Sequence, residues 1–206
     1  MSNKKGLIGS IIGVYSSPRS TFESLDEKDL RKSISLILLI ALVSAAASST
    51  YMSKINIPLP NTGTLPAMGN LRSVISVISG LVGFLGVIIS WMLITALVYA
   101  VAKMSGGQGM LKGFYAQTGF AYSPLLIQHL LRLIDALTFN SSLGIPTIGN
   151  RLISAFLGTF NIFGVINIIL LIIAVSVNQK IGVKKAALIT LLTTTILLLP
   201  SLILFQ

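Results

Sequence analysis

The sequence predicts an all-α integral membrane protein, a bundle of five transmembrane helices, and three observations support this fold class. Five stretches of the 206-residue chain lack Asp, Glu, Lys and Arg and are rich in aliphatic residues. Each is close to or above the ~20 apolar residues that a helix needs to cross a bilayer. Hydrophobic residues make up 53% of the chain and charged residues only 10%, as is typical of membrane proteins. The uncharged stretches are 33–53, 73–102, 113–131, 152–179 and 186–206.

The five spans are expected to form one domain that covers residues 1–206. A spanning β-strand would alternate apolar and polar residues and be about half as long, so only helices fit. The connections are too short for a separate soluble domain, and the absence of cysteine excludes disulfides and thiolate metal sites. We place the helices at about 33–52, 72–103, 113–138, 151–178 and 185–205, after a cytoplasmic segment 1–32.

Basic residues gather on one side of these spans. Eleven of the fifteen Lys and Arg residues precede the first span or lie in the connections near 103–112 and 180–185. The positive-inside rule puts this side in the cytoplasm. A multi-pass protein of the plasma membrane is expected, with its N-terminus cytoplasmic and its C-terminus outside. The triplet at Asn140, a glycosylation acceptor by sequence, would lie in the outer loop 139–150.

The segment before the first span is amphipathic. Its apolar residues recur at helical spacing beside two lysines, which is typical of a short helix on an anionic membrane surface. A helix packed beneath the bundle would show the same pattern, and the two interpretations are compatible. Ser17 is suited to cap a second short helix with proline in its first turn. The predicted surface segment comprises Lys4, Lys5, Leu7, Ile8, Ile11, Ile12, Tyr15, Pro18 and Phe22.

A mixed-charge run at 26–32 follows, and four of the five acidic residues lie between 23 and 29. Such a run is either a solvated junction or a docking surface for a cytoplasmic protein partner.

The second span carries small residues at intervals of four. This spacing lets two helix backbones approach closely, either within one molecule or between two copies in a homo-oligomer. The stripe comprises Ser76, Gly80, Gly83, Gly86 and Ser90. Trp91 is too deep for an interfacial residue, so it is expected to pack in the bundle or line a lipid-facing groove.

The third span carries His129, Arg132 and Asp135 on one broad helical face. Arg132 and Asp135 are spaced to pair, which would lower the cost of burying either charge. Ionisable residues within the membrane are candidates for function. At ~1.5 Å per residue, Asp135 lies near the outer interface and His129 deeper. We expect either a structural pair in the outer leaflet or a ligand, ion or proton site. Pro124 should kink this helix and free a carbonyl.

The fourth span carries two asparagines, and amides within a span usually bond to another helix. Asn161 is expected to meet the polar face of the third span. The candidate intramembrane polar site comprises Tyr122, Pro124, His129, Arg132, Asp135, Asn161 and Asn167.

No catalytic constellation is predicted. One histidine and five acids, four of them before the first span, cannot build a zinc site or a carboxylate dyad within the membrane. The sequence has no phosphate-binding loop. We therefore expect no enzyme, no metal and no cofactor. Nucleic acid is not an expected partner, because the basic residues mark orientation in the lipid bilayer.

Four motifs in order resemble the Yip-one (Ypt/Rab-interacting protein) domain family in its prokaryotic five-span branch. Residues 17–22 (SPRSTF) resemble its N-terminal signature, and 98–109 (VYAVAKMSGGQG) resemble the end of its second span with a Gly-Gly turn. Residues 118–124 (TGFAYSP) resemble its third span. Residues 181–188 (IGVKKAAL) resemble the entry to its fifth span, although Lys184 stands where the family often has serine or threonine.

The resemblance implies five helical spans with a cytoplasmic N-terminus. Eukaryotic relatives bind Rab-type GTPases and one another and affect membrane shape, but their long cytoplasmic N-terminal region is not expected here. We predict a non-enzymatic membrane-organising scaffold or adaptor that self-associates or recruits a partner. The alternative is a transporter, channel or lipid-handling protein with a polar cavity between spans two to four.

Overall fold

The computed structural model describes residues 6–54, 68–138 and 161–203, and the elements within these ranges are helical. In chain order they are α1 (Leu7–Ser16), α2 (Pro18–Ser24), the 3-10 helix η1 (Glu27–Asp29), α3 (Leu30–Lys54), α4 (Met68–Met104), α5 (Leu111–Ala121), α6 (Ser123–Thr138), α8 (Ile162–Gln179) and α9 (Val183–Ile203).

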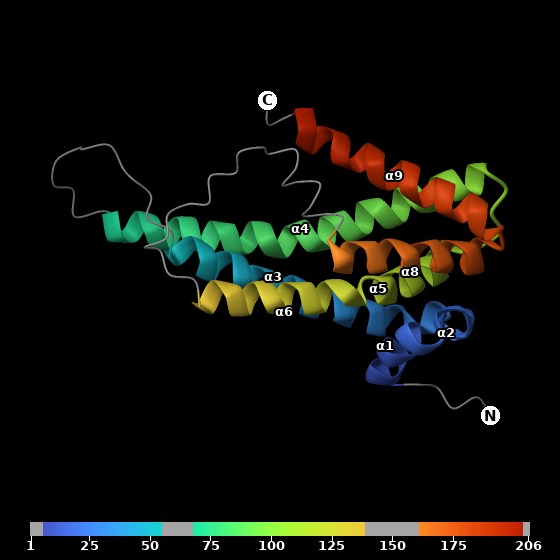
Figure 1. Ribbon diagram of the computed structural model, residues 1–206, viewed down its shortest axis with the longest axis horizontal. Coiled ribbons are helices and arrows are strands. Elements are labelled where there is room, and N and C mark those ends of the chain that lie inside the picture. Colours follow the sequence, from blue (N-terminus) through green and yellow to red (C-terminus); the bar gives the residue numbers. More distant parts are fainter. Residues whose placement is uncertain (1–5, 55–67, 139–160, 204–206) are drawn as a thin grey trace.

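The long helices run side by side, and the two short N-terminal helices lie at one end of them (Figure 1). Helix α3 packs against α4, α5 and α6, while α8 packs against α5, α6 and α9. The α4–α5 and α8–α9 connections lie at the same end of the bundle as α1 and α2 (Figure 1). This is the end on which the sequence places most basic residues.

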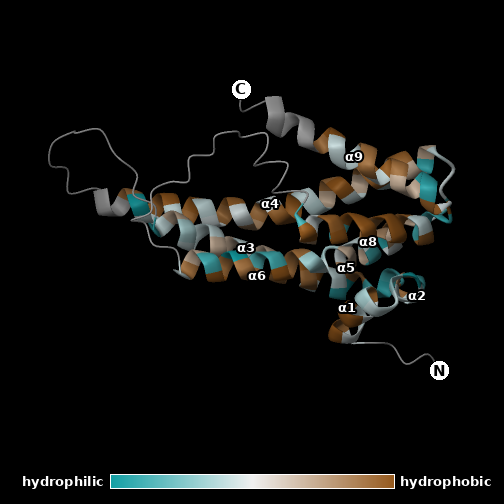
Figure 2. Cartoon of the chain, in the orientation of Figure 1, coloured by the Kyte–Doolittle hydropathy of each residue, from teal (hydrophilic) through white to brown (hydrophobic). Residues whose placement is uncertain are grey.

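Hydrophobic residues predominate along the long helices (Figure 2), and many of their side chains are exposed. On α4, for example, Val77 is 61% exposed and Val82 is 65% exposed. Three helical stretches are long and apolar enough to cross a membrane: Glu27–Lys54, Leu71–Met104 and Ile162–Gln179. Such surfaces suit a lipid solvent, because exposed aliphatic side chains cost nothing in hydrocarbon.

Helix α3 begins a few residues before the predicted span because its start is capped. The Asp26 carboxylate accepts the Lys28 N–H at 2.8 Å, and the Asp29 carboxylate accepts the Asp26 N–H at 3.3 Å. This reciprocal capping box satisfies backbone N–H groups that have no acceptor in a preceding helical turn. The capped 3-10 helix η1 therefore continues directly into the first long helix, α3.

The predicted third span is two helices. Helix α5 ends at Ala121 and α6 begins at Ser123. Pro124 has no N–H, and the Leu125 N–H bonds to the Tyr122 carbonyl at 2.9 Å. The α-helical acceptor for Leu125 would be Ala121, so the break leaves that carbonyl for another partner.

The predicted fourth span is described from Asn161 onward. Helix α8 begins at Ile162, so the predicted residues 151–160 and the triplet at Asn140 lie outside the described residues. Lys4 and Lys5 lie outside them as well.

Candidate functional site

The broken helix is held by a hydrogen bond from α8. The Asn167 Nδ2 donates to the Ala121 carbonyl at 2.9 Å. A carbonyl left without a helical partner is costly in hydrocarbon, so this bond offsets the break at Pro124. Asn167 thereby fixes α8 against the α5–α6 junction.

Asn161 has a local role instead. Its Oδ1 accepts the N–H groups of Phe163 at 3.0 Å and Gly164 at 2.9 Å, as an N-cap of α8. The expected meeting of Asn161 with the polar face of the third span stays a prediction, because these two bonds account for its carbonyl oxygen alone.

The N-terminal helices are bound to α5 from the basic end of the bundle. The Gln117 Nε2 donates to the carbonyls of Phe22 at 2.8 Å and Leu25 at 3.4 Å, and the Phe22 side chain is fully buried. The Ser123 hydroxyl donates to the Tyr15 hydroxyl at 3.2 Å. One segment of the third span thus holds both α1 and α2.

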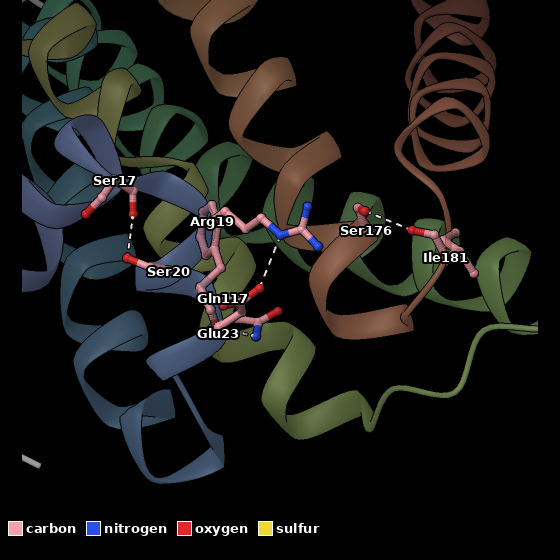
Figure 3. A network of polar contacts seen from close by, with 8 residues as sticks. Ser17, Arg19, Ser20, Glu23, Gln117, Ser176 and Ile181 are labelled. Carbon is pink, nitrogen blue, oxygen red and sulfur yellow. Dashed lines mark hydrogen bonds and ion pairs between the residues drawn. The ribbon is translucent and has the colours of Figure 1, made fainter.

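Helix α2 presents a polar outer surface. Arg19 Nε lies 3.2 Å from the Glu23 carboxylate, and both side chains are largely exposed. Figure 3 shows this pair on α2 with Gln117 of α5 beside it. The same view shows the Ser176 hydroxyl bonded to the Ile181 carbonyl, which closes the α8–α9 turn at 2.8 Å.

Helix α1 has one face packed and one face outward. Ser10, Gly13 and Val14 are buried, whereas Ile8 is 72% exposed and Ile12 is 61% exposed. The Tyr15 ring is partly exposed, while its hydroxyl reaches Ser123. Burial raises the pKa of the Tyr15 hydroxyl above its ordinary value of 10.0, and the hydrogen bond from Ser123 offsets part of that rise.

A buried polar cluster joins α4 to α5. Trp91 Nε1 donates to the Thr118 hydroxyl at 3.3 Å, and the Thr95 hydroxyl lies 3.0 Å from the same atom. The Trp91 ring meets Tyr115 edge-on, with centroids 5.2 Å apart. Trp91 is 6% exposed, so it packs in the bundle.

The Gly-Gly turn after α4 is closely packed. A Cβ on Gly109 would lie 2.4 Å from the Asn178 carbonyl oxygen, and one on Gly107 would lie 3.1 Å from the Gln179 Cβ. The Gln108 N–H donates to the Gln179 carbonyl at 3.0 Å. Glycine is therefore required here because the turn touches the end of α8.

The small-residue stripe divides between two environments. Ser76 bonds to Ser49 of α3, with hydroxyl oxygens 2.9 Å apart, and a Cβ on Gly83 would lie 2.8 Å from the Ser48 hydroxyl. Gly80 likewise faces Ser49. These three residues pack α4 on α3 within the molecule. A Cβ on Gly86 would meet no atom within 4 Å, and the Ser90 hydroxyl donates to its own helix.

A cavity of about 520 Å³ lies between α4, α6, α8 and α9. Four residues of the predicted polar site line it, namely Tyr122, His129, Arg132 and Asn167, whereas Pro124, Asp135 and Asn161 do not. Two stripe residues join them. The full lining is Gly86, Ile89, Ser90, Leu93, Ile94, Tyr122, Leu125, Gln128, His129, Arg132, Gly164, Asn167, Ile168, Leu171, Thr194 and Leu197.

Arg132 and Asp135 do not form the expected pair. The ion pairs within the described ranges join Arg19 to Glu23 and Lys32 to Asp29. The i, i+3 spacing permitted a pair, but both side chains are exposed, and exposed pairs gain little from contact. In the same ranges no group of three His, Cys, Asp or Glu side chains is placed to hold a metal ion.

The fold and these contacts define a helical membrane protein. The Yip1 domain family model matches residues 12–205, nearly the whole chain, so the chain belongs to the Yip1 domain family. No curated protein and no solved structure matches the chain. The match confirms the resemblance read from the four motifs, and the TGFAYSP motif contains the helix break and the polar contacts around it.

Sequence reasoning missed Gln117 and Gln128. Gln117 holds α2, and Gln128 lines the cavity. The signal was present, because both are amides within an uncharged stretch, where an unpaired amide is costly.

Proposed function

We propose that this protein is a non-enzymatic membrane-organising scaffold whose helix α1 inserts its outward face into the cytoplasmic leaflet. Five crossings are made by α3, α4, the broken α5–α6, α8 and α9, with α1 and α2 on the cytoplasmic side. Neither α5, with 11 residues, nor α6, with 16, crosses alone. Together they exceed the ~20 residues that one crossing needs. Membership of the Yip1 domain family supports a membrane protein without catalysis.

The observation that carries this function is the docking of α1 on the bundle with one face left exposed. Its inner face is buried and tied to the α5–α6 junction by Tyr15, while Ile8 and Ile12 point away from the bundle. Transfer of two such side chains from water into the interface is worth about 3 kcal/mol. A short helix held in this way acts as a wedge beside the bundle and fixes how the protein sits in the cytoplasmic leaflet.

The polar surface of α2 and η1 is the complementary feature. Arg19, Glu23 and Lys28 are exposed there and point to water instead of the bundle. We assign partner recruitment to this surface, because mixed charge favours specific protein contacts over lipid.

The insertion of α1 can be tested directly. A nitroxide attached to Ile12→Cys in liposomes should collide more often with oxygen, which concentrates in lipid, than with a water-soluble nickel chelate. The matched control is Lys28→Cys on the exposed polar surface of η1, where the chelate should dominate. Equal access of the chelate to both positions would exclude the insertion of α1 into the leaflet.

Self-association is tested separately. Energy transfer between donor- and acceptor-labelled copies in vesicles should exceed random proximity and persist as lipid is added. Ile8→Ser/Ile12→Ser should reduce it if α1 organises the assembly. Transfer that falls to the random level on dilution would exclude a self-associating scaffold.

The alternative function, transport or lipid handling, is favoured by one observation, the cavity beside His129 and Arg132. Flux of protons or ions through proteoliposomes that His129→Ala abolishes would support transport. Absence of flux in the wild-type protein would leave the cavity as a binding site alone.

A further inference from the structure

The walls of the cavity between α4, α6, α8 and α9 are mostly aliphatic. Its volume of about 520 Å³ falls within the range of ~300–1,000 Å³ of ligand-binding pockets. A site of this kind inside a membrane protein takes a ligand with a hydrocarbon part. The aliphatic side chains are Ile89, Leu93, Ile94, Leu125, Ile168, Leu171 and Leu197.

The cavity is about one leaflet deep. Tyr122 lies at the helix break and Arg132 lies ten residues further along, and both line the cavity. Ten residues of helix rise ~15 Å, which is half of the ~30 Å hydrocarbon core. Helix α6 runs away from α1 and α2 (Figure 1), so the Arg132 end of the cavity is the one farther from them. The dimensions match one acyl chain of the leaflet remote from the N-terminal helices, called here the remote leaflet.

Uncommitted hydrogen-bond donors gather at that end. The donors of Ser90, Thr194 and Asn167 already bond to backbone carbonyls. Within the described residues, Gln128, His129 and Arg132 have no such partner, and they lie within little more than one turn of α6. The Tyr122 hydroxyl, at the helix break, is the other lining donor without one.

Arg132 gives this end of the cavity a positive charge, and no acidic side chain of the described residues contacts it. Arg132 has no carboxylate within ion-pair distance in the described ranges, and Asp135 does not line the cavity. A guanidinium is planar and binds phosphate oxygens in a bidentate manner, with Gln128 and His129 placed to add single bonds.

We propose that this cavity binds an anionic phospholipid from the remote leaflet. One acyl chain occupies the aliphatic cavity down to the helix break, and the phosphate binds Arg132. A lipid with net negative charge is preferred over a zwitterionic one, because the site offers a cation without an acidic partner for a headgroup ammonium. This proposal does not rest on the insertion of α1, because α1 contacts the bundle at the helix break whereas Arg132 lies ten residues further along.

The test is native mass spectrometry of the full chain in mild detergent, titrated with phosphatidylglycerol or phosphatidylcholine of identical chains. One phosphatidylglycerol should bind about tenfold more tightly than phosphatidylcholine. Arg132→Gln should weaken both lipids by about tenfold or more, because each loses a charged hydrogen bond to its phosphate. It should also remove the difference between them, because the choline ammonium then no longer faces an unpaired cation. Arg132→Lys should retain part of it, because the point charge remains but the bidentate geometry is lost.

A second variant tests the chain-binding part. Gly86 lines the cavity and has free space for a side chain, so Gly86→Leu should fill it and weaken both lipids without breaking α4. The matched controls are Arg72→Gln and Val82→Leu on α4, which lie outside the lining and should bind like wild type. Thermal unfolding of each variant confirms that it is folded.

Three results would overturn the proposal. Arg132→Gln with an intact preference for phosphatidylglycerol would place the phosphate elsewhere. Unchanged binding by Gly86→Leu would place the acyl chain on the outer surface. Competition by glycerophosphate as effective as that by the whole lipid would reduce the site to one for a small anion.

Discussion

Substituting Gly119 by alanine should separate α5 from α3. A Cβ on Gly119 would lie 1.7 Å from the Ser33 hydroxyl oxygen, 2.9 Å from its Cβ and 3.3 Å from its Cα. Ser33 is fully buried and its hydroxyl donates to the Tyr115 carbonyl at 3.0 Å. Rotating that hydroxyl away would lose the bond and would still leave the two Cβ atoms too close.

The expected cost follows from opposing terms. Overpacking a well-filled contact costs about 1–3 kcal/mol, and losing the Ser33 hydrogen bond costs about 1 kcal/mol. Alanine regains about 1 kcal/mol of helix propensity over glycine. We therefore expect Gly119→Ala to lower the free energy of unfolding by about 2 kcal/mol.

Equilibrium unfolding in mixed detergent micelles measures this difference through tryptophan fluorescence. Trp91 is the only tryptophan of the chain, and its indole bonds to Thr118, the residue before Gly119. Ser33→Gly in the Gly119→Ala background leaves only the 3.3 Å contact and should recover part of the loss. Gly86→Ala, where a Cβ meets nothing within 4 Å, is the control and should be neutral or slightly stabilising. A Gly119→Ala protein as stable as wild type would refute the α3–α5 contact.

Three further predictions concern the contacts at the two ends of α8 and at α1. Asn167→Ala should cost about 1 kcal/mol in the same unfolding assay, because the Ala121 carbonyl loses its partner; no loss would mean that the carbonyl is satisfied otherwise. Lys180→Gly should stabilise by about 1 kcal/mol, since Lys180 holds a left-handed φ of 54° that glycine adopts without strain; a destabilised variant would contradict this turn. The raised pKa of Tyr15 means that the docked state favours the neutral hydroxyl, so its contribution is complete below pH 10.0 and is lost as pH rises through the raised pKa. Spin-label mobility at Ser16→Cys should therefore increase at high pH, and Tyr15→Phe should remove this dependence.

Much of the helical layout was predictable because it depends on local composition. Uncharged runs marked α3, α4 and α9 to within a few residues, since lipid requires the backbone to bond internally. The proline at 124 predicted a distortion of the third span and a freed carbonyl. The structure shows both, as the break at Tyr122 and the buried Ala121 carbonyl that accepts the Asn167 amide.

Partners across the bundle were less predictable, because they depend on how helices rotate about their axes. Asn161 and Asn167 looked equivalent by type and burial, yet one caps its own helix and the other reaches α5. Their difference is positional: Asn161 precedes the first turn of α8, where backbone N–H groups need an acceptor. The cavity likewise depends on Gly86 facing space instead of a neighbouring helix.

The arrangement of the bundle in the bilayer is tested most directly by labelling single cysteines with a membrane-impermeant maleimide, because the chain has no cysteine of its own. The informative positions are Ser16, Gln108 and Lys184 at one end of the bundle and Ser53 and Thr138 at the other, all of them exposed. Five crossings with α1 in the cytoplasm predict labelling of Ser53→Cys and Thr138→Cys in intact cells and of the other three only after permeabilisation. Labelling of Gln108→Cys and Lys184→Cys from opposite faces would contradict the five-span account.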